Sequence, residues 1–152
     1  MRLRFLCNNH RTWLESDSGA AHASWLRSYN QAGILFHAGE ELKAVNYAGC
    51  ALEAAELLVF THARRAAADI HRFTDSAVLL CHSLLGAEQP RLVCGVIGGT
   101  IARLEELLLH GSERAAVLQS CQRMLTALDA NPIAVQPPPE RPEAVAPGWS
   151  VH

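Results

Sequence analysis

Residues 50–85 read CALEAAELLVFTHARRAAADIHRFTDSAVLLCHSLL and contain neither glycine nor proline. The stretch is rich in Ala, Leu, Glu and Arg, which lose little conformational freedom in a helix. One unbroken helix of this length would be improbable in a compact domain, because the mean helix there has about 12 residues. We therefore expect two helices joined by a turn near residues 61–65, although no glycine or proline marks that turn.

Five apolar stripes with helical spacing run along the chain, two of them within or beside this stretch. Apolar or small residues recur every three or four positions, as on the buried face of a helix. Gly39, Gly86 and Gly111 follow stripes as helix-ending residues do, and Pro90 suits a first helical turn. The stripes are Trp25, Tyr29, Ala32 and Phe36; Leu42, Val45, Gly49, Leu52 and Ala55; Ile70, Phe73, Ala77, Leu80 and Leu84; Val93, Ile97, Ile101, Leu104 and Leu108; and Val117, Cys121, Met124 and Leu128.

Prolines divide the chain into two parts. Six of the seven lie in the last 21 residues, so residues 131–152 are expected to form a Pro-rich, polyproline-like or disordered tail. Residues 1–130 are expected to form one all-α domain of antiparallel helix hairpins, either a repeat array or a bundle of five or six helices. Residues 1–6 are either extended or lead into a short helix that ends near Glu15.

Charge and hydropathy exclude several classes of partner. Hydrophobic residues make up 49% of the chain and charged residues 18%, which is a globular composition. Lys43 is the only lysine, and Arg64 and Arg65 are the only adjacent basic pair, so we expect no nucleic acid as a partner. No apolar run approaches the roughly 20 residues of a membrane span, and no secretory signal follows Met1. The expected location is the cytoplasm, with no membrane partner.

The five cysteines agree with a reducing compartment. Their number is odd, and four of them, at positions 50, 81, 94 and 121, fall inside helical apolar patterns. We expect buried, reduced thiols and no disulfide. Cys7-x-x-His10 and the adjacent Cys81 and His82 are the only tight Cys/His spacings, and neither completes a four-ligand set. No metal and no cofactor is expected.

Residues 30–53 read NQAGILFHAGEELKAVNYAGCALE. Small residues stand where two helices would face each other, and Gly39 separates the two halves. The other positions in the pattern are Ala32, Ala44, Tyr47, Ala51 and Leu52. In this respect the segment resembles one tetratricopeptide (TPR) repeat, in which small residues let two antiparallel helices approach closely. A weaker echo links AGILFH at 32–37 to AVLLCH at 77–82, at an offset longer than the family's repeat of about 34 residues.

The resemblance implies a protein-interaction module with a concave groove on the first helix of each hairpin. Such a module, an adaptor, a chaperone-like holder or a regulatory partner, binds a peptide or helix of another protein. The groove positions implied are Tyr29, Gly33, Phe36 and His37, together with Val78 and His82 of the echo. The alternative interpretation is that Tyr29 and Phe36 belong to the core.

A second resemblance concerns residues 81–88, CHSLLGAE. They resemble the histidine-phosphotransfer motif, with His82 as the phosphoryl acceptor and a Leu-Glu pair at positions 104 and 105 on the next helix. The sequence departs from that motif at Leu85, where the family has a lysine. A transferred phosphoryl group needs a nearby cation. A histidine-phosphotransfer-like signalling bundle is therefore kept as an alternative function.

No catalytic signature is present, and we expect no enzyme. The chain has no GxSxG, GxxxxGK[ST] or GxGxxG motif. Glu53 and Glu56 are interpreted as solvated or capping positions and not as metal ligands. Gly98 and Gly99 interrupt the fourth stripe. Either the helix is kinked there or another helix crosses it very closely, and of these two we expect the close crossing. That stripe is apolar around much of its helix, so a self-associating structural bundle, with a homodimer as the partner arrangement, is a further alternative.

Overall fold

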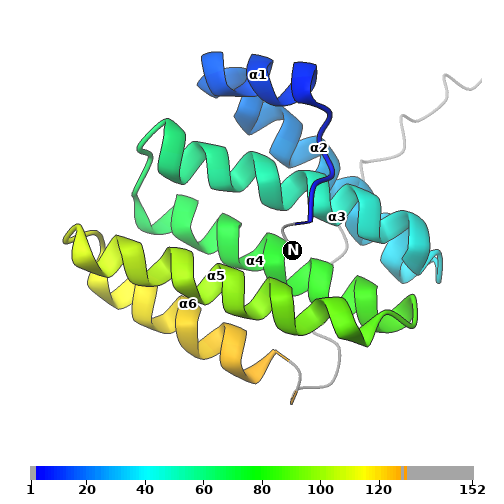
Figure 1. Ribbon diagram of the computed structural model, residues 1–152. Coiled ribbons are helices and arrows are strands. Elements are labelled where there is room, and N and C mark those ends of the chain that lie inside the picture. The colour runs from blue at the N-terminus through cyan, green and yellow to red at the C-terminus, as the bar shows by residue number, and fades with distance from the viewer. Residues whose placement is uncertain (1–2, 128, 130–152) are drawn as a thin grey trace, which may run out of the picture.

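The computed structural model describes residues 3–127 and 129. Within these residues the chain forms six α-helices and one π-helical turn and contains no strand, which confirms the all-α prediction (Figure 1). The first short helix and the long helices after it fall where the sequence pattern places them. The elements are α1 (Asn8–Ser16), α2 (Ser18–His37), α3 (Glu41–Glu56), the π-helical turn (Leu57–Thr61), α4 (Ala67–Gly86), α5 (Pro90–Leu109) and α6 (Arg114–Thr126).

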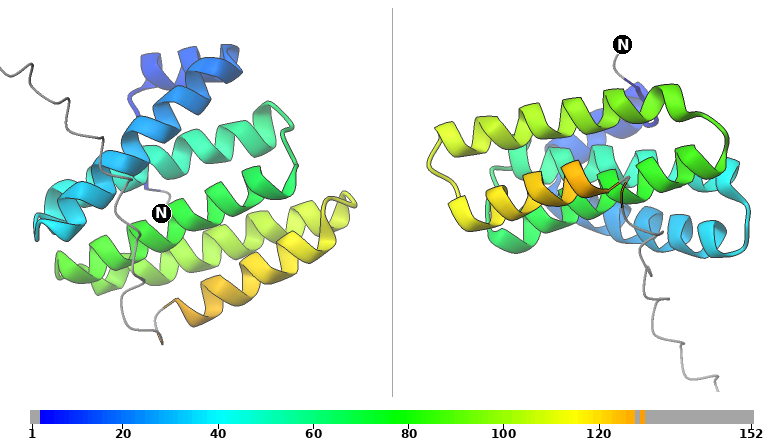
Figure 2. Two further views of the ribbon diagram at one scale, coloured as in Figure 1. Left: turned by 180° about the vertical axis from the view of Figure 1, so that it is seen from behind. Right: turned by 90° about the horizontal axis from the view of Figure 1, so that it is seen from below.

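The long helices form two hairpins and a final single helix, arranged in two layers. Helix α2 packs on α3, α3 on α4, and α4 on both α5 and α6. One layer holds α3 and α5, which lie nearer the viewer in Figure 1. The other layer holds α2, α4 and α6, which lie nearer the viewer in the left view of Figure 2, where the molecule is seen from behind. Because successive helices are antiparallel, α2, α4 and α6 run in the same direction.

The turn between α3 and α4 lies where the sequence predicts it, without a glycine to form it. The π-helical turn extends α3 to Thr61, and His62 N and Arg64 N still donate to the carbonyls of Leu57 and Leu58, both at 2.9 Å. Ala63 then adopts a φ of +53°, a left-handed conformation that glycine would adopt at lower cost. Gly39, at +75°, takes the corresponding role between α2 and α3.

Helix α4 occupies the centre of the molecule. Its predicted stripe, Ile70 to Leu84, is buried throughout. Its polar residues are satisfied locally: Ser76 Oγ donates to the carbonyl of Arg72 at 2.8 Å and accepts from Trp25 Nε1 at 2.9 Å. The second of these bonds joins α4 to α2 across the core.

The small residues of the TPR-like segment lie at the α2–α3 contact. Ala32, Ala44 and Ala51 are fully buried there, as a close approach of two helices requires. Leu42 and Tyr47 are exposed, so the apolar stripe on α3 is narrower than its sequence pattern indicates. The predicted antiparallel hairpin of residues 30–53 is therefore confirmed, whereas the resemblance to the repeat family stays a prediction.

The close helix crossing expected at Gly98 and Gly99 is wrong. Among the residues that the structure describes, a Cβ atom built on either glycine would have no neighbour within 4 Å, and the same holds for Gly95. The close approach in this structure lies at Gly49 on α3, where a Cβ would overlap the ring of Phe5. The N-terminal segment, residues 3–7, therefore packs against α3 at a glycine that cannot carry a side chain without displacing Phe5.

The cysteines are all free, but only Cys81 is fully buried. Cys50 and Cys121 are half-buried and Cys94 is exposed, so the expectation of buried thiols is wrong for these three. Burial raises the pKa of the Cys81 thiol to about 12, with a smaller contribution from Cys94.

We expect iodoacetamide to distinguish these thiols at mildly alkaline pH. Cys7 and Cys94 are exposed and should be alkylated in the folded protein, whereas Cys81 should react only after denaturation, because it is buried and stays protonated. Peptide mass spectrometry after timed alkylation provides the measurement. Modification of Cys81 as fast as Cys94 in folded protein would contradict the packing of α4.

Replacement of Gly49 by alanine should destabilise the protein through Phe5. We expect a loss of about 1–3 kcal/mol in the free energy of unfolding, because the new methyl group would overlap the ring. In a Phe5→Ala background, the same change should be neutral or stabilise the helix by up to about 1 kcal/mol. Urea denaturation of the four proteins gives the coupling free energy.

The control for this cycle is Gly98→Ala. Gly98 is also helical but has open space around it, so alanine should stabilise α5 by about 0.5–1 kcal/mol. If Gly49→Ala destabilised the protein equally with Phe5 and with Ala at position 5, the overlap with the Phe5 ring would not be the cause of the destabilisation.

Candidate functional site

A cleft of about 730 Å³ opens between α3 and α5. Helix α4 packs against both and contributes Phe73 and Leu80 to the cleft lining, while Leu3 and Phe5 of the N-terminal segment lie at its edge. Helices α3 and α5, which form its walls, lie on the side of the molecule that faces the viewer in Figure 1. A volume of this size is typical of sites that bind a ligand or a partner's side chains.

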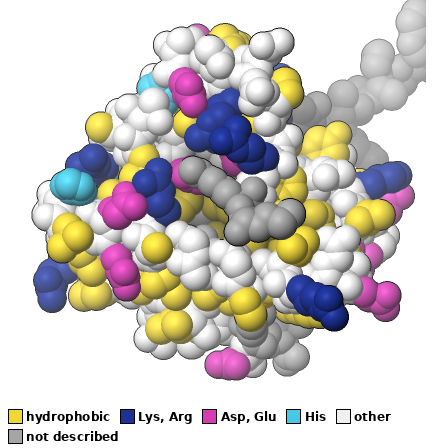
Figure 3. Space-filling model, in the orientation of Figure 1, with side chains coloured by type: hydrophobic (Ala, Val, Ile, Leu, Met, Phe, Trp, Pro, Cys, Tyr) yellow, Lys and Arg dark blue, Asp and Glu magenta, His cyan; other side chains and the backbone are white. Residues whose placement is uncertain are grey.

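The walls of the cleft are apolar, and part of the α5 wall carries no side chains. Leu52 on α3 and Leu92 and Val96 on α5 supply apolar side chains. Gly95 and Gly99, one helical turn apart on α5, line the cleft with backbone only. A partner atom can therefore come much closer to the axis of α5 here than to any ordinary helix. Figure 3 shows hydrophobic and charged side chains interspersed over this face.

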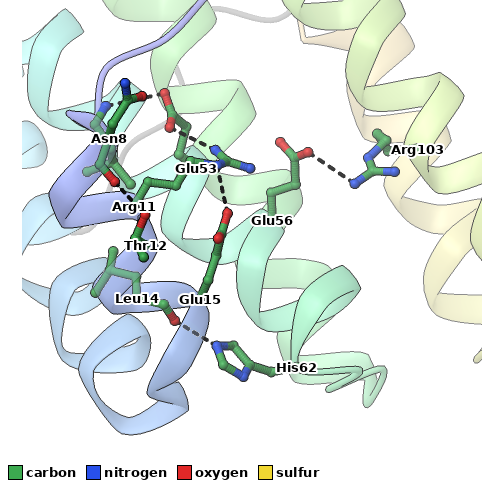
Figure 4. A network of polar contacts seen from close by, with 10 residues as sticks. Asn8, Arg11, Thr12, Leu14, Glu15, Glu53, Glu56, His62 and Arg103 are labelled. Atoms are coloured by element: carbon green, nitrogen blue, oxygen red, sulfur yellow. Dashed lines mark hydrogen bonds and ion pairs between the residues drawn. The ribbon is translucent and has the colours of Figure 1, made fainter.

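The buried carboxylate of Glu53 fixes one edge of the cleft. Its Oε1 accepts from the backbone N–H groups of Phe5 and, at 3.4 Å, of Leu6, and its Oε2 lies 3.1 Å from Arg11 Nη1 (Figure 4). Only 6% of Glu53 is exposed, so the interpretation of Glu53 as a solvated position is wrong. A buried carboxylate needs such partners, and here they tie both the N-terminal segment and α1 to α3.

Arg103 bridges the two walls at the other edge. Its Nη2 lies 3.1 Å from Glu56 Oε1 on α3, and its Nη1 lies 2.8 Å from Glu106 Oε2 on α5 (Figure 4). Its guanidinium carbon lies 3.9 Å from the centre of the Phe60 ring, a stacked cation–π arrangement. Arg103 therefore links α5 to α3 beside the cleft.

The charges of the cleft leave one group without an opposite charge. Glu53, Glu56, Glu106 and Arg103 all take part in ion pairs, whereas Arg91 is exposed and pairs with no carboxylate between residues 3 and 127. Over the same part of the chain, no three His, Cys, Asp or Glu side chains are grouped as metal ligands. The arrangement suits binding of an apolar surface that carries an acidic group.

The groove residues predicted from sequence lie elsewhere, on α2 and α4. Tyr29 and Phe36 are half-buried and His37 is exposed, whereas the α4 residues His82 and Val78 are buried. Gly33 is also buried. The structure brings Phe36 and His82 together, with ring centroids 6.4 Å apart. None of the six lines the α3–α5 cleft.

His82 is poorly placed to accept a phosphoryl group. Only 8% of it is exposed, and burial lowers its pKa. Leu104 of the accompanying Leu-Glu pair is buried in the core, and only Glu105 reaches the surface. The burial of the imidazole argues against phosphotransfer at this position, because the donor protein would have to reach the acceptor nitrogen.

No protein-family model, no curated protein and no solved structure matches this chain. The resemblance to the TPR family therefore rests on residues 30–53 and on the weaker echo at 77–82. Among the helices that the structure describes, none combines the length and the hydropathy needed to cross a membrane.

The cleft residues had only a partial signal in the sequence. The sequence shows several glycines in α5. An open cleft and a close helix crossing both require small residues, so the glycine pattern does not distinguish these two arrangements. Glu53 and Arg11 had no signal, because they are 42 positions apart and meet only after α1 folds onto the helices.

We expect Glu53→Gln to loosen the N-terminal segment. Loss of the charge leaves Arg11 without its buried partner, at a cost of about 2 kcal/mol or more in the free energy of unfolding. Hydrogen exchange at the amides of Phe5 and Leu6 should accelerate, because both donate to this carboxylate. Urea denaturation and exchange measured by NMR provide the two readouts.

Glu15→Gln is the matched control. Glu15 pairs with the same arginine at 3.1 Å but is exposed, so its loss should change stability by no more than about 0.5 kcal/mol. Similar effects of the two substitutions would contradict the role assigned to Glu53.

Proposed function

We propose that this protein is an interaction domain that binds a short amphipathic helix of another protein in the α3–α5 cleft. The observation that carries the proposal is the glycine wall of α5, which is open and exposed although it borders an apolar cleft. Glycines in the middle of a helix lower its stability by about 1 kcal/mol each relative to alanine. Gly95 and Gly99 make no compensating contact within the described chain, and the backbone of a bound partner would supply that contact.

A helix suits the shape of the cleft. Gly95 and Gly99 are four residues apart, so together they form a shallow notch along one face of α5. A helix that lies in this notch can direct its apolar side chains at positions i, i+3 or i+4, and i+7 toward Leu52, Leu92 and Val96. The apolar floor from α4 completes the surface that would be buried.

Arg91 would set the direction in which the partner helix lies in the cleft. It lies in the first turn of α5 at one end of the cleft, exposed and unpaired among residues 3–127, whereas the opposite end holds the paired Arg103 and Glu106. An acidic residue of the partner would be attracted to the Arg91 end. Such a charge contributes more to orientation and association rate than to affinity.

Filling the notch should abolish binding without unfolding the protein. We expect a Gly95→Leu/Gly99→Leu double variant to lose the proteins that wild type captures from a native lysate, because leucine side chains would occupy the space of the partner. Candidates recovered only with wild type are then made as purified peptides. Titration calorimetry should show a loss of affinity of about tenfold or more in the double variant.

Gly98→Leu is the control, since Gly98 is equally open on α5 but does not line the cleft. It should capture the same proteins as wild type. Unchanged capture by the double variant, with circular dichroism showing an intact fold, would rule out the cleft as the binding surface. A cleft-dependent complex that contains only this chain, seen by light scattering, would replace the heterologous helix by a homodimer.

A further inference from the structure

We propose that the Pro-rich segment of this chain, residues 131–152, docks on the α2–α4 face, defined here by Tyr29, Phe36, Val78 and His82. This surface lies on the side of the molecule turned toward the viewer in the left view of Figure 2, opposite the α3–α5 cleft. The inference goes beyond the proposed function, because it concerns a different surface and a ligand within the same chain.

The position where α6 ends brings the segment to this face. Helix α6 runs parallel to α4, and the ion pair of Arg123 Nη2 with Asp75 Oδ1, at 2.5 Å, sets their register. Thr126, the last residue of α6, is therefore nearly level with Val78, about one turn before His82. The described helix α6 therefore ends beside the α2–α4 face, five positions before residue 131 in the sequence.

The length of the segment is sufficient to cross both helices. In a polyproline conformation each residue advances about 3.1 Å, so ten residues span about 30 Å. Neighbouring helix axes lie about 8–10 Å apart. A stretch of the segment that includes residues 137–139, three consecutive prolines, can therefore extend over α4 and onto α2.

His82 supplies an unsatisfied polar group at the centre of this face. It is 8% exposed, and its Nε2 is buried without a hydrogen-bond partner among the described residues. A buried nitrogen in this state costs free energy until it is paired. The ring of Phe36, half-buried on α2, lies beside it, with centroids 6.4 Å apart.

A Pro-rich backbone has the chemistry that such a site lacks. A polyproline helix makes no internal hydrogen bonds, and its carbonyl oxygens are free to accept. The imidazole N–H of His82 and the hydroxyl of Tyr29 can donate, and burial raises the pKa of that hydroxyl, so it stays protonated. Proline rings pack well on half-buried aromatic rings such as those of Tyr29 and Phe36, as in other recognition of polyproline segments.

Photo-crosslinking in the full chain tests this contact. Phe36 is replaced by p-benzoylphenylalanine, an aromatic residue that keeps the ring at this position. After irradiation we expect peptides from residues 131–152 to be joined to position 36 within one chain, with a yield that does not fall on dilution. The matched control is the same replacement at Ile34, which is 49% exposed on α2 and outside the α2–α4 face. It should give little of this product.

A second variant tests the role of the prolines. Replacement of Pro137, Pro138 and Pro139 by glycine keeps the length of the segment but raises the conformational entropy lost on docking. The intramolecular product should fall about fivefold or more. If the variant at Phe36 does not fold by circular dichroism, the probe is placed at Tyr29, for which the same results are expected.

Three results would overturn the proposal. They are the absence of any product with residues 131–152, equal yields from positions 36 and 34, and a product formed only between two chains. The readout is independent of the α3–α5 cleft, so failure here leaves the helix-binding proposal untouched, and the reverse also holds.

Discussion

Helix α4 is apolar around most of its circumference, and the need to cover it on every side arranges the rest of the structure. Four helices contact it: α2 and α3 from one hairpin, and α5 and α6 from the other side. Its serines and threonine bond to carbonyls four residues back, so α4 leaves no hydroxyl unpaired in the core. Burial of large apolar side chains, at about 25 cal/mol per Å² of apolar surface, favours this central position.

The cleft is a consequence of this arrangement that the protein maintains. Helices α3 and α5 both pack on α4, and they would bury more surface if they also packed on each other. Instead, Arg103 bridges from α5 to Glu56 on α3, and the segment held by Glu53 lies against α3 beside the cleft. The three glycines of α5 lower its helical stability by about 3 kcal/mol in total, without a packing gain inside the described chain. Local costs of this kind are expected at functional surfaces.

The two layers give the molecule two different surfaces. The α3–α5 side carries an open apolar cleft with the exposed Arg91 at one end, whereas the α2–α4 side carries half-buried aromatic rings over a buried imidazole. The α3–α5 cleft suits a helix, because the side chains on one face of a helix need a groove to enter. The second suits an extended Pro-rich backbone, whose carbonyls need donors. A protein that held its own segment on one surface would keep the other available to a partner.

The sequence by itself determined the helices, their order and most of their buried positions. The 3.6-residue period reports which side of a helix faces the core, so the stripe from Ile70 to Leu84 was readable, as was the turn at Gly39. Tertiary structure alone decided the spacing between helices. Small residues on α5 were equally consistent with a close crossing and with an open cleft, and the burial of Glu53 depends on Arg11, 42 positions away. The 3.6-residue period shows which side of a helix faces the core, whereas the distance from one helix to its neighbour is set by how all the helices pack together.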